Sequence, residues 1–382
     1  MLTTICCRSF ALIAVCGVVL LADQKTDSGG LFPVQTVWTL ALNNQLTMPP
    51  AYDSTSVFFS IAPDQIVAYD LISGTQKWIV SAQPLFEPAI GEGLVLFAEP
   101  DGLTALRADD GSVAWRLPLA EKPAQRPVWD NGWLIVAAAG GTIHAYRASD
   151  GYLVWSRELA SRAHAAAALA ADRVYVPTDD GRVVALAVET GSVEWERKLG
   201  GAPQEILALE DRIFVGASDN FFYSLIARDG RVDWRWRTGG DTVGAAVADE
   251  RRVYFVALDN VLRAMHRTSG AQIWMRPLPL RPIAGVVLAG RALVVAGQLG
   301  LRGYNAGDGA AAGEIQATPE VAAPPHGFTS AETKLPSLLY LTKDLAKGAT
   351  ATLVQRSLEP PSAPIAPLPN AVMPEPRVPS DR

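Results

Sequence analysis

Residues 185–195 read Ala-Leu-Ala-Val-Glu-Thr-Gly-Ser-Val-Glu-Trp, and this stretch decides the fold. Its alanine is followed by a glycine six residues later and by a tryptophan four residues after the glycine. The pattern occurs six times, once with Ser224 in place of the alanine. The glycines are Gly74, Gly111, Gly151, Gly191, Gly230 and Gly270, and the tryptophans are Trp78, Trp115, Trp155, Trp195, Trp234 and Trp274. Successive motif glycines are 37 to 40 residues apart, which indicates one repeated structural unit.

Each repeat also reads as four short strands. In the repeat that contains Trp195, a small apolar run at 165–170 precedes a β-rich run at 173–177. After an Asp-Asp-Gly turn, an alternating segment at 182–188 leads through a Thr-Gly turn to the strand with the tryptophan. Short strands separated by such turns are typical of antiparallel hairpins. A four-stranded unit of this length, repeated along the chain, predicts a β-propeller blade.

The three motif residues have structural roles in such a blade. The glycine lies between the third and fourth strands, where it supplies a positive φ to the turn. The tryptophan on the outermost strand is expected to bury its ring where neighbouring blades meet, with the indole N–H donating to a backbone carbonyl. The small residue leaves room for that ring. We therefore expect these tryptophans to pack blades together rather than to bind a ligand.

The repeats continue into the C-terminal part of the chain. Seven full modules begin near residues 51, 85, 126, 165, 204, 243 and 283. The seventh is degenerate, because its three motif positions are Gly303, Gly309 and Gly313. Three more strands are predicted around Phe328, at 337–342 and at 349–358. The chain therefore contains seven complete blades and three strands of an eighth.

Trp38 marks the missing strand. It lies in the segment 35–42, forty residues before Trp78 and ahead of the first complete repeat. An all-β, eight-bladed propeller whose ring is closed by this N-terminal strand uses every predicted strand and leaves no open edge. A seven-bladed ring with one stray strand is the alternative.

The N-terminus resembles an export signal. Arg8 precedes a run of 13 apolar residues that ends at Ala22. Residues 1–22 are therefore predicted to be a signal peptide or a membrane anchor. Cleavage after Ala22, an uncleaved anchor and lipidation of Cys16 all stay open. The residues before Cys16 resemble a lipobox, but Val15 stands where a small residue is usual.

Three segments follow the export signal. Residues 23–34 are predicted to be a linker and residues 35–358 the propeller. Residues 359–382 contain eight prolines and should form an extended, disordered tail. We interpret this tail as passive rather than as a docking peptide.

Composition excludes several function classes. The chain has 382 residues and a net charge of −6. This charge argues against nucleic-acid binding, because a nucleic-acid-binding domain normally carries a basic face. Its three cysteines are Cys6, Cys7 and Cys16, so no cysteine follows the export signal. A disulfide scaffold, a zinc–cysteine site and a cysteine nucleophile are therefore excluded from the rest of the chain.

The Ala-x5-Gly-x3-Trp motif resembles the tryptophan-docking motif of pyrroloquinoline-quinone-type propellers. The resemblance covers residues 35–358. The length, the export signal and eight blades without an added domain most resemble the BamB family of outer-membrane β-barrel assembly lipoproteins. That family reaches its partner through a long interblade loop, for which the uniform spacing here leaves little room. The resemblance therefore carries over no partner-binding residues.

No catalytic, cofactor-binding or metal-binding residue is expected from the sequence. Quinoprotein dehydrogenases are similar propellers with an adjacent-cysteine disulfide over the quinone, and the only such pair here, Cys6–Cys7, lies in the export signal. Metal sites usually show paired ligand spacings, which the four histidines lack. These are His144, His164, His266 and His326. The sequence predicts that the chain is not an enzyme and has no cofactor.

Phe221 is the one candidate contact for a partner. The hairpin between the second and third strands reads Gly181-Arg182-Val183 in one blade and Asn220-Phe221-Phe222 in the next. Phe221 thus replaces an arginine that should be exposed, and exposed aromatic residues can mark interaction surfaces.

These observations predict a non-catalytic, protein-interaction scaffold of the cell envelope with a BamB-like role in the assembly or insertion of outer-membrane β-barrel proteins. Its expected partners are envelope proteins such as the β-barrel assembly machinery, within which it would be a monomer. It would be exported to the periplasm and held at the outer or inner membrane, if at all, only through its N-terminus. The alternative is a periplasmic quinone- or ligand-binding propeller related to dehydrogenases.

Overall fold

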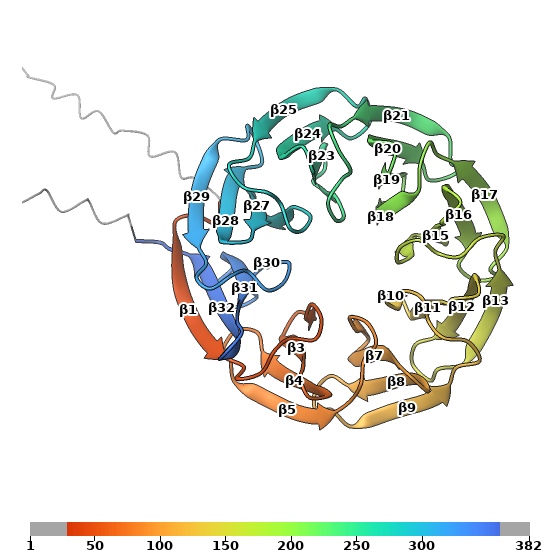
Figure 1. The fold of residues 1–382 in the computed structure, drawn as a ribbon, viewed down its shortest axis with the longest axis horizontal. Coiled ribbons are helices and arrows are strands. Elements are labelled where there is room, and N and C mark those ends of the chain that lie inside the picture. Colours follow the sequence, from red (N-terminus) through yellow and green to blue (C-terminus); the bar gives the residue numbers. More distant parts are fainter. Residues whose placement is uncertain (1–28, 360–382) are drawn as a thin grey trace, which may run out of the picture.

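A computed structural model describes residues 29–359, which form a closed ring of eight four-stranded antiparallel sheets around a central axis (Figure 1). In seven blades the strands pair in chain order, with the first strand innermost and the fourth outermost. The eighth blade has the order β1-β32-β31-β30. Its outermost strand therefore comes from the N-terminal end of the described chain. The predicted eight-bladed ring and its closure are confirmed, and the seven-bladed alternative is wrong.

The first four blades follow one another from residue 51. Blade 1 comprises β2 (Ala51–Tyr52), β3 (Ser56–Ile61), β4 (Gln65–Asp70) and β5 (Gln76–Ser81). Blade 2 comprises β6 (Ala89–Gly91), β7 (Leu94–Glu99), β8 (Gly102–Arg107) and β9 (Val113–Pro118). Blade 3 comprises β10 (Val128–Asp130), β11 (Trp133–Ala137), β12 (Thr142–Arg147) and β13 (Leu153–Glu158). Blade 4 comprises β14 (Ala168–Ala170), β15 (Arg173–Pro177), β16 (Arg182–Ala187) and β17 (Val193–Lys198).

The other four blades complete the ring. Blade 5 comprises β18 (Pro203–Ala208), β19 (Arg212–Ala217), β20 (Phe221–Ile226) and β21 (Val232–Arg237). Blade 6 comprises β22 (Val247–Ala248), β23 (Arg252–Ala257), β24 (Val261–His266) and β25 (Gln272–Pro277). Blade 7 comprises β26 (Val287–Ala289), β27 (Ala292–Gly297), β28 (Gly300–Asn305) and β29 (Ala311–Gln316). Blade 8 comprises β30 (His326–Thr329), β31 (Pro336–Asp344), β32 (Gly348–Arg356) and β1 (Val34–Ala41).

The middle strands of each blade form the core. All six residues of β3 are buried, because both faces of that strand are covered by neighbouring blades. The outermost strands alternate instead, and β17 buries Trp195 between exposed residues. One hydrophobic cluster joins Tyr175 and Trp195 of blade 4 to Val215 of blade 5. The core is therefore a ring of such contacts between blades.

The ring has two faces, which differ in their turns. We call the motif face the one that carries the turns between first and second strands and between third and fourth strands, including the motif glycines. The crossover face carries the hairpins between second and third strands and the connections between blades. On the motif face, the Ser357 N–H donates to the Pro33 carbonyl at 2.7 Å. The N-terminal and C-terminal ends of the described chain therefore lie together there.

The predicted segments at the chain ends are mostly beyond the described residues. The signal peptide or anchor at 1–22 lies outside them, as do Cys16, the first half of the linker 23–34 and all but the first residue of the tail 359–382. Within residues 29–359, no helix is long and apolar enough to cross a membrane.

Candidate functional site

The motif tryptophans lie where neighbouring blades meet. Each ring lies against the motif glycine of the following blade, so that Trp155 covers Gly191 and Trp195 covers Gly230. Each indole N–H donates to a carbonyl of that blade at 2.7 to 3.2 Å. The donors are Trp38, Trp78, Trp115, Trp155, Trp195, Trp234 and Trp274. The motif glycines Gly74, Gly111, Gly151, Gly191, Gly230 and Gly270 all have positive φ angles between 66° and 73°.

Arginines two residues after the tryptophan add a second contact that the sequence analysis missed. The Nε atoms of Arg157, Arg197 and Arg276 donate to the carbonyls of the next motif glycines at 2.6 to 2.8 Å. Their recurrence at one distance from the tryptophan is the signal that could have revealed them. Each such pair adds a hydrogen bond between blades at the exposed rim.

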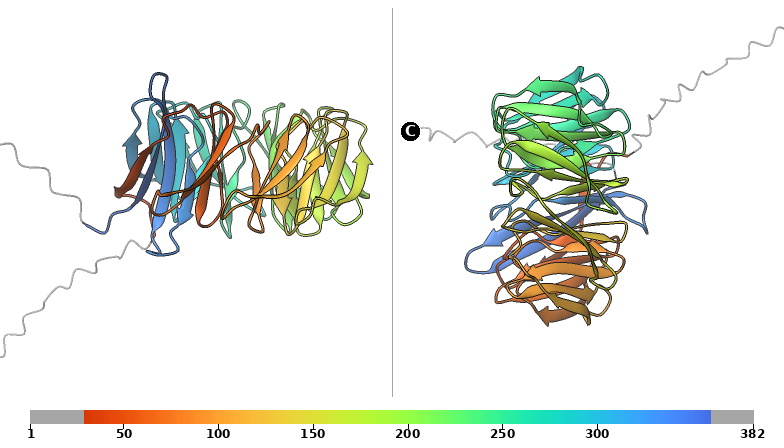
Figure 2. Two further views of the ribbon diagram at one scale, coloured as in Figure 1. Left: turned by 90° about the horizontal axis from the view of Figure 1, so that it is seen from below. Right: turned by 90° about the vertical axis from the view of Figure 1, so that its right-hand side faces the viewer.

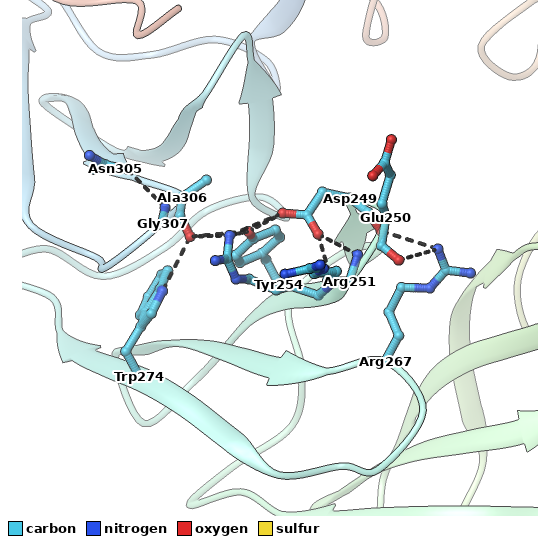
Figure 3. Close-up of polar contacts among 10 residues, drawn as sticks. Asp249, Glu250, Arg251, Tyr254, Arg267, Trp274, Asn305, Ala306 and Gly307 are labelled. Carbon is cyan, nitrogen blue, oxygen red and sulfur yellow. Dashed lines mark hydrogen bonds and ion pairs between the residues drawn. The ribbon is translucent and has the colours of Figure 1, made fainter. Parts of the chain in front are cut away.

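A polar junction ties blades 6 and 7 together on the motif face (Figure 3). The Tyr254 hydroxyl lies 2.6 Å from Asp249 Oδ2 and 3.1 Å from the Ala306 carbonyl. The same carbonyl accepts the Trp274 indole N–H at 3.2 Å. The Arg252 guanidinium lies 3.4 Å from Asp249 Oδ2 and 3.4 Å from the Ala306 carbonyl.

Electrostatics hold this junction in one charge state. Burial, with the hydrogen bond to Asp249, raises the pKa of Tyr254 to about 12, so the phenol stays protonated. Burial opposes ionisation of Asp249, but hydrogen bonds from Tyr254 and from the backbone of Arg251 and Arg252 hold its pKa below the usual value. The ionised Asp249 carboxylate is therefore satisfied by its hydrogen-bond donors, which is typical of a structural junction.

Arg267 extends the junction to blade 5. Its guanidinium donates to the Asp249 carbonyl at 3.1 Å and to the Glu250 carbonyl at 3.3 Å (Figure 3). It also donates to Asp211 Oδ1 at 3.1 Å. Its own carbonyl accepts the Trp234 indole N–H at 2.9 Å. Arg267 therefore links blade 5 to blade 6, and Tyr254 and Arg252 link blade 6 to blade 7.

A cavity of about 550 Å³ lies beside the junction. Its lining includes Leu288, Gly290, Arg291 and the segment 249–252, together with 305–307. Arg252 is paired inside the junction, whereas Arg251 and Arg291 are exposed at the surface of the ring. The exposed Glu250 carboxylate lies in the same lining, so the cavity is bordered by charges of both signs.

A second group of titratable side chains lies on innermost strands of the ring. The ring of His326, on the innermost strand β30, stacks on Tyr52 of β2 with centroids 3.9 Å apart and planes 5° apart. Burial lowers the pKa of His326 to about 4. The Tyr52 hydroxyl is buried and has no hydrogen-bond partner among the described residues, and burial raises its pKa. His326 and Tyr52 are therefore both neutral at pH 7.

Glu87, Arg126 and Glu205 come near the same axis. Burial raises the pKa of Glu87, the charge of Arg126 lowers it, and Glu205 raises it again. Because these residues belong to blades 2, 3 and 5, the interactions of Glu87 with Arg126 and Glu205 require all three to lie toward the central axis. They lie 39 and 79 residues apart, so they occupy one repeat position that is Ala165 in blade 4. That shared spacing could have identified the group in the sequence.

The other histidines lie apart. His144 Nδ1 lies 2.8 Å from Ser156 Oγ, and burial lowers its pKa. His164 Nδ1 lies 2.7 Å from Asp179 Oδ1, and His266 contacts Thr268 of its own turn. No group of three His, Cys, Asp or Glu side chains within residues 29–359 is arranged to hold a metal ion.

Phe221 is less accessible than the sequence suggests. It is half-buried at the start of β20, and the Arg235 guanidinium carbon lies 4.7 Å from the centre of its ring. An aromatic neighbour of Phe221 is Tyr223, and the centroids of the two rings lie 6.0 Å apart. The ring is therefore covered on one side by a cation of the same blade.

Comparison with known proteins gives one family. The model of the family described as outer membrane protein assembly factor BamB matches residues 34–127, 101–209 and 205–325. Among solved structures, BamB from Moraxella catarrhalis is 18% identical with a TM-score of 0.65, over 84% of this chain and 99% of that chain. A search of the curated proteins found no match.

Two enzymes share the architecture. Quinohemoprotein alcohol dehydrogenase ADHIIG from Pseudomonas putida HK5 is 12% identical with a TM-score of 0.65, over 90% of this chain and 80% of that chain. A europium-containing methanol dehydrogenase is 11% identical with a TM-score of 0.64, over 84% of this chain and 93% of that chain. These matches contradict the prediction that the chain is not an enzyme. No cysteine follows Cys16, which excludes an adjacent-cysteine disulfide from the ring, whereas other propellers of this architecture are enzymes.

Proposed function

Because the chain belongs to the family of the outer membrane protein assembly factor BamB, we propose that it is a protein-interaction scaffold that serves the assembly or insertion of outer-membrane β-barrel proteins. The single observation that carries this proposal is the family match, which runs from residue 34 to residue 325 and spans nearly the whole ring. Its partners would be proteins of the cell envelope, among them the β-barrel assembly machinery.

The architecture supports a scaffold because hydrogen bonds join the blades into one ring, while the turns at its two faces are available to a partner. Seven indole hydrogen bonds lock successive blades together. Function on such a frame resides in side chains presented at its faces. Phe221 stays a candidate contact, and the stacking of Arg235 on its ring would have to be exchanged for a partner's side chain.

The same proposal places the protein outside the cytoplasm. Residues 1–22 would direct export, as a signal peptide cleaved after Ala22, as an uncleaved anchor or as a leader lipidated at Cys16. Residues 23–34 would link that end to the propeller, and the tail at 359–382 would follow it. In the assembled complex we propose a single copy of this chain.

Affinity capture from detergent-solubilised envelopes tests the proposal. The full chain, tagged at its C-terminus and produced in its own host, should recover components of the β-barrel assembly machinery. Deletion of the gene should reduce the amount of folded β-barrel proteins in the outer membrane. If the exported, folded protein recovers none of these components and its deletion leaves barrel proteins unchanged, the proposal is overturned.

A quinone assay distinguishes the scaffold from the alternative, a quinone-dependent dehydrogenase. The same purified protein is incubated with pyrroloquinoline quinone, Ca²⁺ and primary alcohols, and reduction of an artificial electron acceptor is followed. Sustained turnover would favour a quinone-dependent dehydrogenase over the scaffold.

A further inference from the structure

Two glycines fasten the N-terminal end of the described chain to blades 7 and 8. The Gly29 carbonyl accepts the backbone N–H of Arg291 at 2.7 Å, and the Gly30 carbonyl accepts the Arg356 guanidinium at 2.7 Å. A Cβ atom added at Gly290 would lie 2.4 Å from the Gly29 oxygen, so the two segments are in close contact. The chain therefore enters the described structure at the turn between β26 and β27 of blade 7.

The same turn lines the cavity of about 550 Å³ between blades 6 and 7. Gly290 and Arg291 contribute to the lining from blade 7, and the turn 249–252 contributes from blade 6. Seen from its edge, the ring gathers its turns on two opposite faces (Figure 2), and these two turns belong to the motif face. The point at which the chain enters the ring is therefore also the edge of a cavity.

Three exposed charges border this cavity and have no ion-pair partner within residues 29–359. They are the Arg291 guanidinium of blade 7 and the Glu250 carboxylate and Arg251 guanidinium of blade 6. The Glu250 side chain points away from the polar junction (Figure 3). The Arg291 side chain lies along the incoming chain, because a Cβ atom added at Gly29 would be 3.6 Å from its Cγ and Cδ. The cavity therefore suits a segment with charges of both signs.

The sequence immediately before Gly29 carries such charges. Residues 23–28 read Asp-Gln-Lys-Thr-Asp-Ser, so that Asp23, Lys25 and Asp27 alternate in sign at every second position. In an extended segment, side chains two residues apart lie on one face. Six extended residues reach up to about 20 Å, which exceeds the roughly 10 Å diameter of a sphere of 550 Å³. The segment is therefore long enough to cross the cavity.

The covalent connection to Gly29 limits where these charges can be. Asp27 is two residues before Gly29, so the Cα atoms of the two residues are at most about 7 Å apart. The Asp27 carboxylate is therefore within reach of the Arg291 guanidinium, which begins beside Gly29. Lys25 is two residues further along the same face, where its charge matches the Glu250 carboxylate of the other blade.

We propose that residues 23–28 occupy the cavity between blades 6 and 7, with Asp27 paired to Arg291 and Lys25 paired to Glu250. A segment of the same chain is favoured over a separate partner, because its attachment at Gly29 gives it an effective concentration in about the millimolar range beside the cavity. A single exposed ion pair contributes little. The two pairs and the covalent attachment therefore act together.

Docking of this segment would fix the direction in which the N-terminal end leaves the ring. Residues 1–22 directly precede the docked segment. This consequence rests on the proposed function, in which residues 1–22 or a lipid on Cys16 hold the chain at a membrane. The motif face of blades 6 and 7 would then be turned toward the membrane, and the crossover face would be turned toward partner proteins.

Photocrosslinking from position 26 tests the docking. Thr26 lies between the two paired residues and is retained whether the chain is cleaved after Ala22, anchored or lipidated. A photoreactive amino acid replaces it in the full chain, and the exported, purified protein is irradiated and digested for mass spectrometry. The main adduct should join position 26 to the turn 249–252 of blade 6. The absence of this adduct, or a main adduct with another part of the chain, a second copy or a different protein, overturns the proposal.

Charge reversals test the pairing. Arg291→Glu should reduce the adduct severalfold, and Asp27→Arg in that background should restore it. Arg281→Glu removes an exposed cation on the crossover face and is the matched control, which should leave the adduct unchanged. Because both arginines are exposed, the single variants should unfold at the wild-type temperature. An adduct that persists in Arg291→Glu, or that Asp27→Arg does not restore, overturns the pairing.

The docking and the proposed function fail separately. If position 26 crosslinks to the turn 249–252 but affinity capture recovers no component of the β-barrel assembly machinery, the docking stands and the proposed function is overturned. If capture recovers the machinery while position 26 gives no such adduct, the docking is overturned and the proposed function stands.

Discussion

The ring of Phe32 fills the space beside Gly313, at the position where the seventh blade lacks a docking tryptophan. A Cβ atom added at Gly313, or at its neighbour Gly303 across the strands, would overlap that ring. In the other blades a tryptophan reaches forward onto the glycine turn of the next blade. Blade 8 has no such turn, because its third and fourth strands are β32 and β1, from opposite ends of the described chain. The aromatic ring therefore comes from blade 8 and the glycines from blade 7.

Phe32→Ala should destabilise the protein by about 3–5 kcal/mol, because Phe32 is only 8% exposed and loss of its phenyl ring leaves a cavity where blades 7 and 8 meet. Urea unfolding followed by tryptophan fluorescence measures this free energy. Gly313→Ala should destabilise the wild-type protein by overlap, yet cost little in the Phe32→Ala background. Additive effects of the two substitutions would contradict the pairing.

Gly191→Ala should cost more than Gly93→Ala by about 1–3 kcal/mol of unfolding free energy, the usual cost of overpacking. Both glycines have similar φ angles, +67° and +72°, so the strain of the turn is the same in both variants. A Cβ at Gly191 would lie 2.5 Å from the Trp155 ring, whereas none of the described atoms lies within 4 Å of one at Gly93. Equal losses of stability in thermal or urea unfolding would show that the tryptophan contact does not limit this position.

Sequence periodicity predicted those parts of the structure that the ring repeats. Trp155 and Gly191 make a contact that recurs in successive blades, so the residues leave a regular spacing in the chain. Phe32 makes its contact once, from within a predicted linker, and no pattern marks it.

The candidate sites show the same limit. Tyr254 and Ala306 are more than fifty residues apart and meet only because blades 6 and 7 are packed together. The exposure expected for Phe221 was wrong for a similar reason, because the alignment of repeats does not show that Arg235 lies over its ring. Contacts between blades that occur only once can therefore be identified only from the structure.

His326 should make the protein less stable in acid. Burial lowers its folded pKa to about 4 from 6.5, so between these values the unfolded state binds the proton and the folded state does not. Stability should therefore fall by up to about 3 kcal/mol as pH falls from 6.5 to 4, since each unit of pKa shift is worth about 1.4 kcal/mol. His326→Phe preserves an aromatic stack on Tyr52 and should remove that part of the pH dependence.

Nuclear magnetic resonance gives an independent check on this residue. The ring signals of His326, assigned by their loss in His326→Phe, should stay constant between pH 8 and pH 5. A titration centred near pH 6.5 would show that the ring is hydrated and would contradict the burial seen beside Tyr52.

Tyr254→Phe should destabilise the junction between blades 6 and 7 by about 0.5–1.5 kcal/mol, because Asp249, which is partly exposed and keeps its other donors, loses the one 2.6 Å from its Oδ2. The hydroxyl helps hold the folded pKa of Asp249 below its unfolded value of about 3.9. That stabilisation is complete above the unfolded pKa and is lost as pH falls through the folded pKa. The difference between wild type and variant should therefore be full at pH 6 and shrink below about pH 4. Tyr152→Phe, at a ring that is 62% exposed, is the matched control and should leave stability unchanged. A Tyr254→Phe loss that is independent of pH would assign the effect to the Ala306 carbonyl instead of the carboxylate.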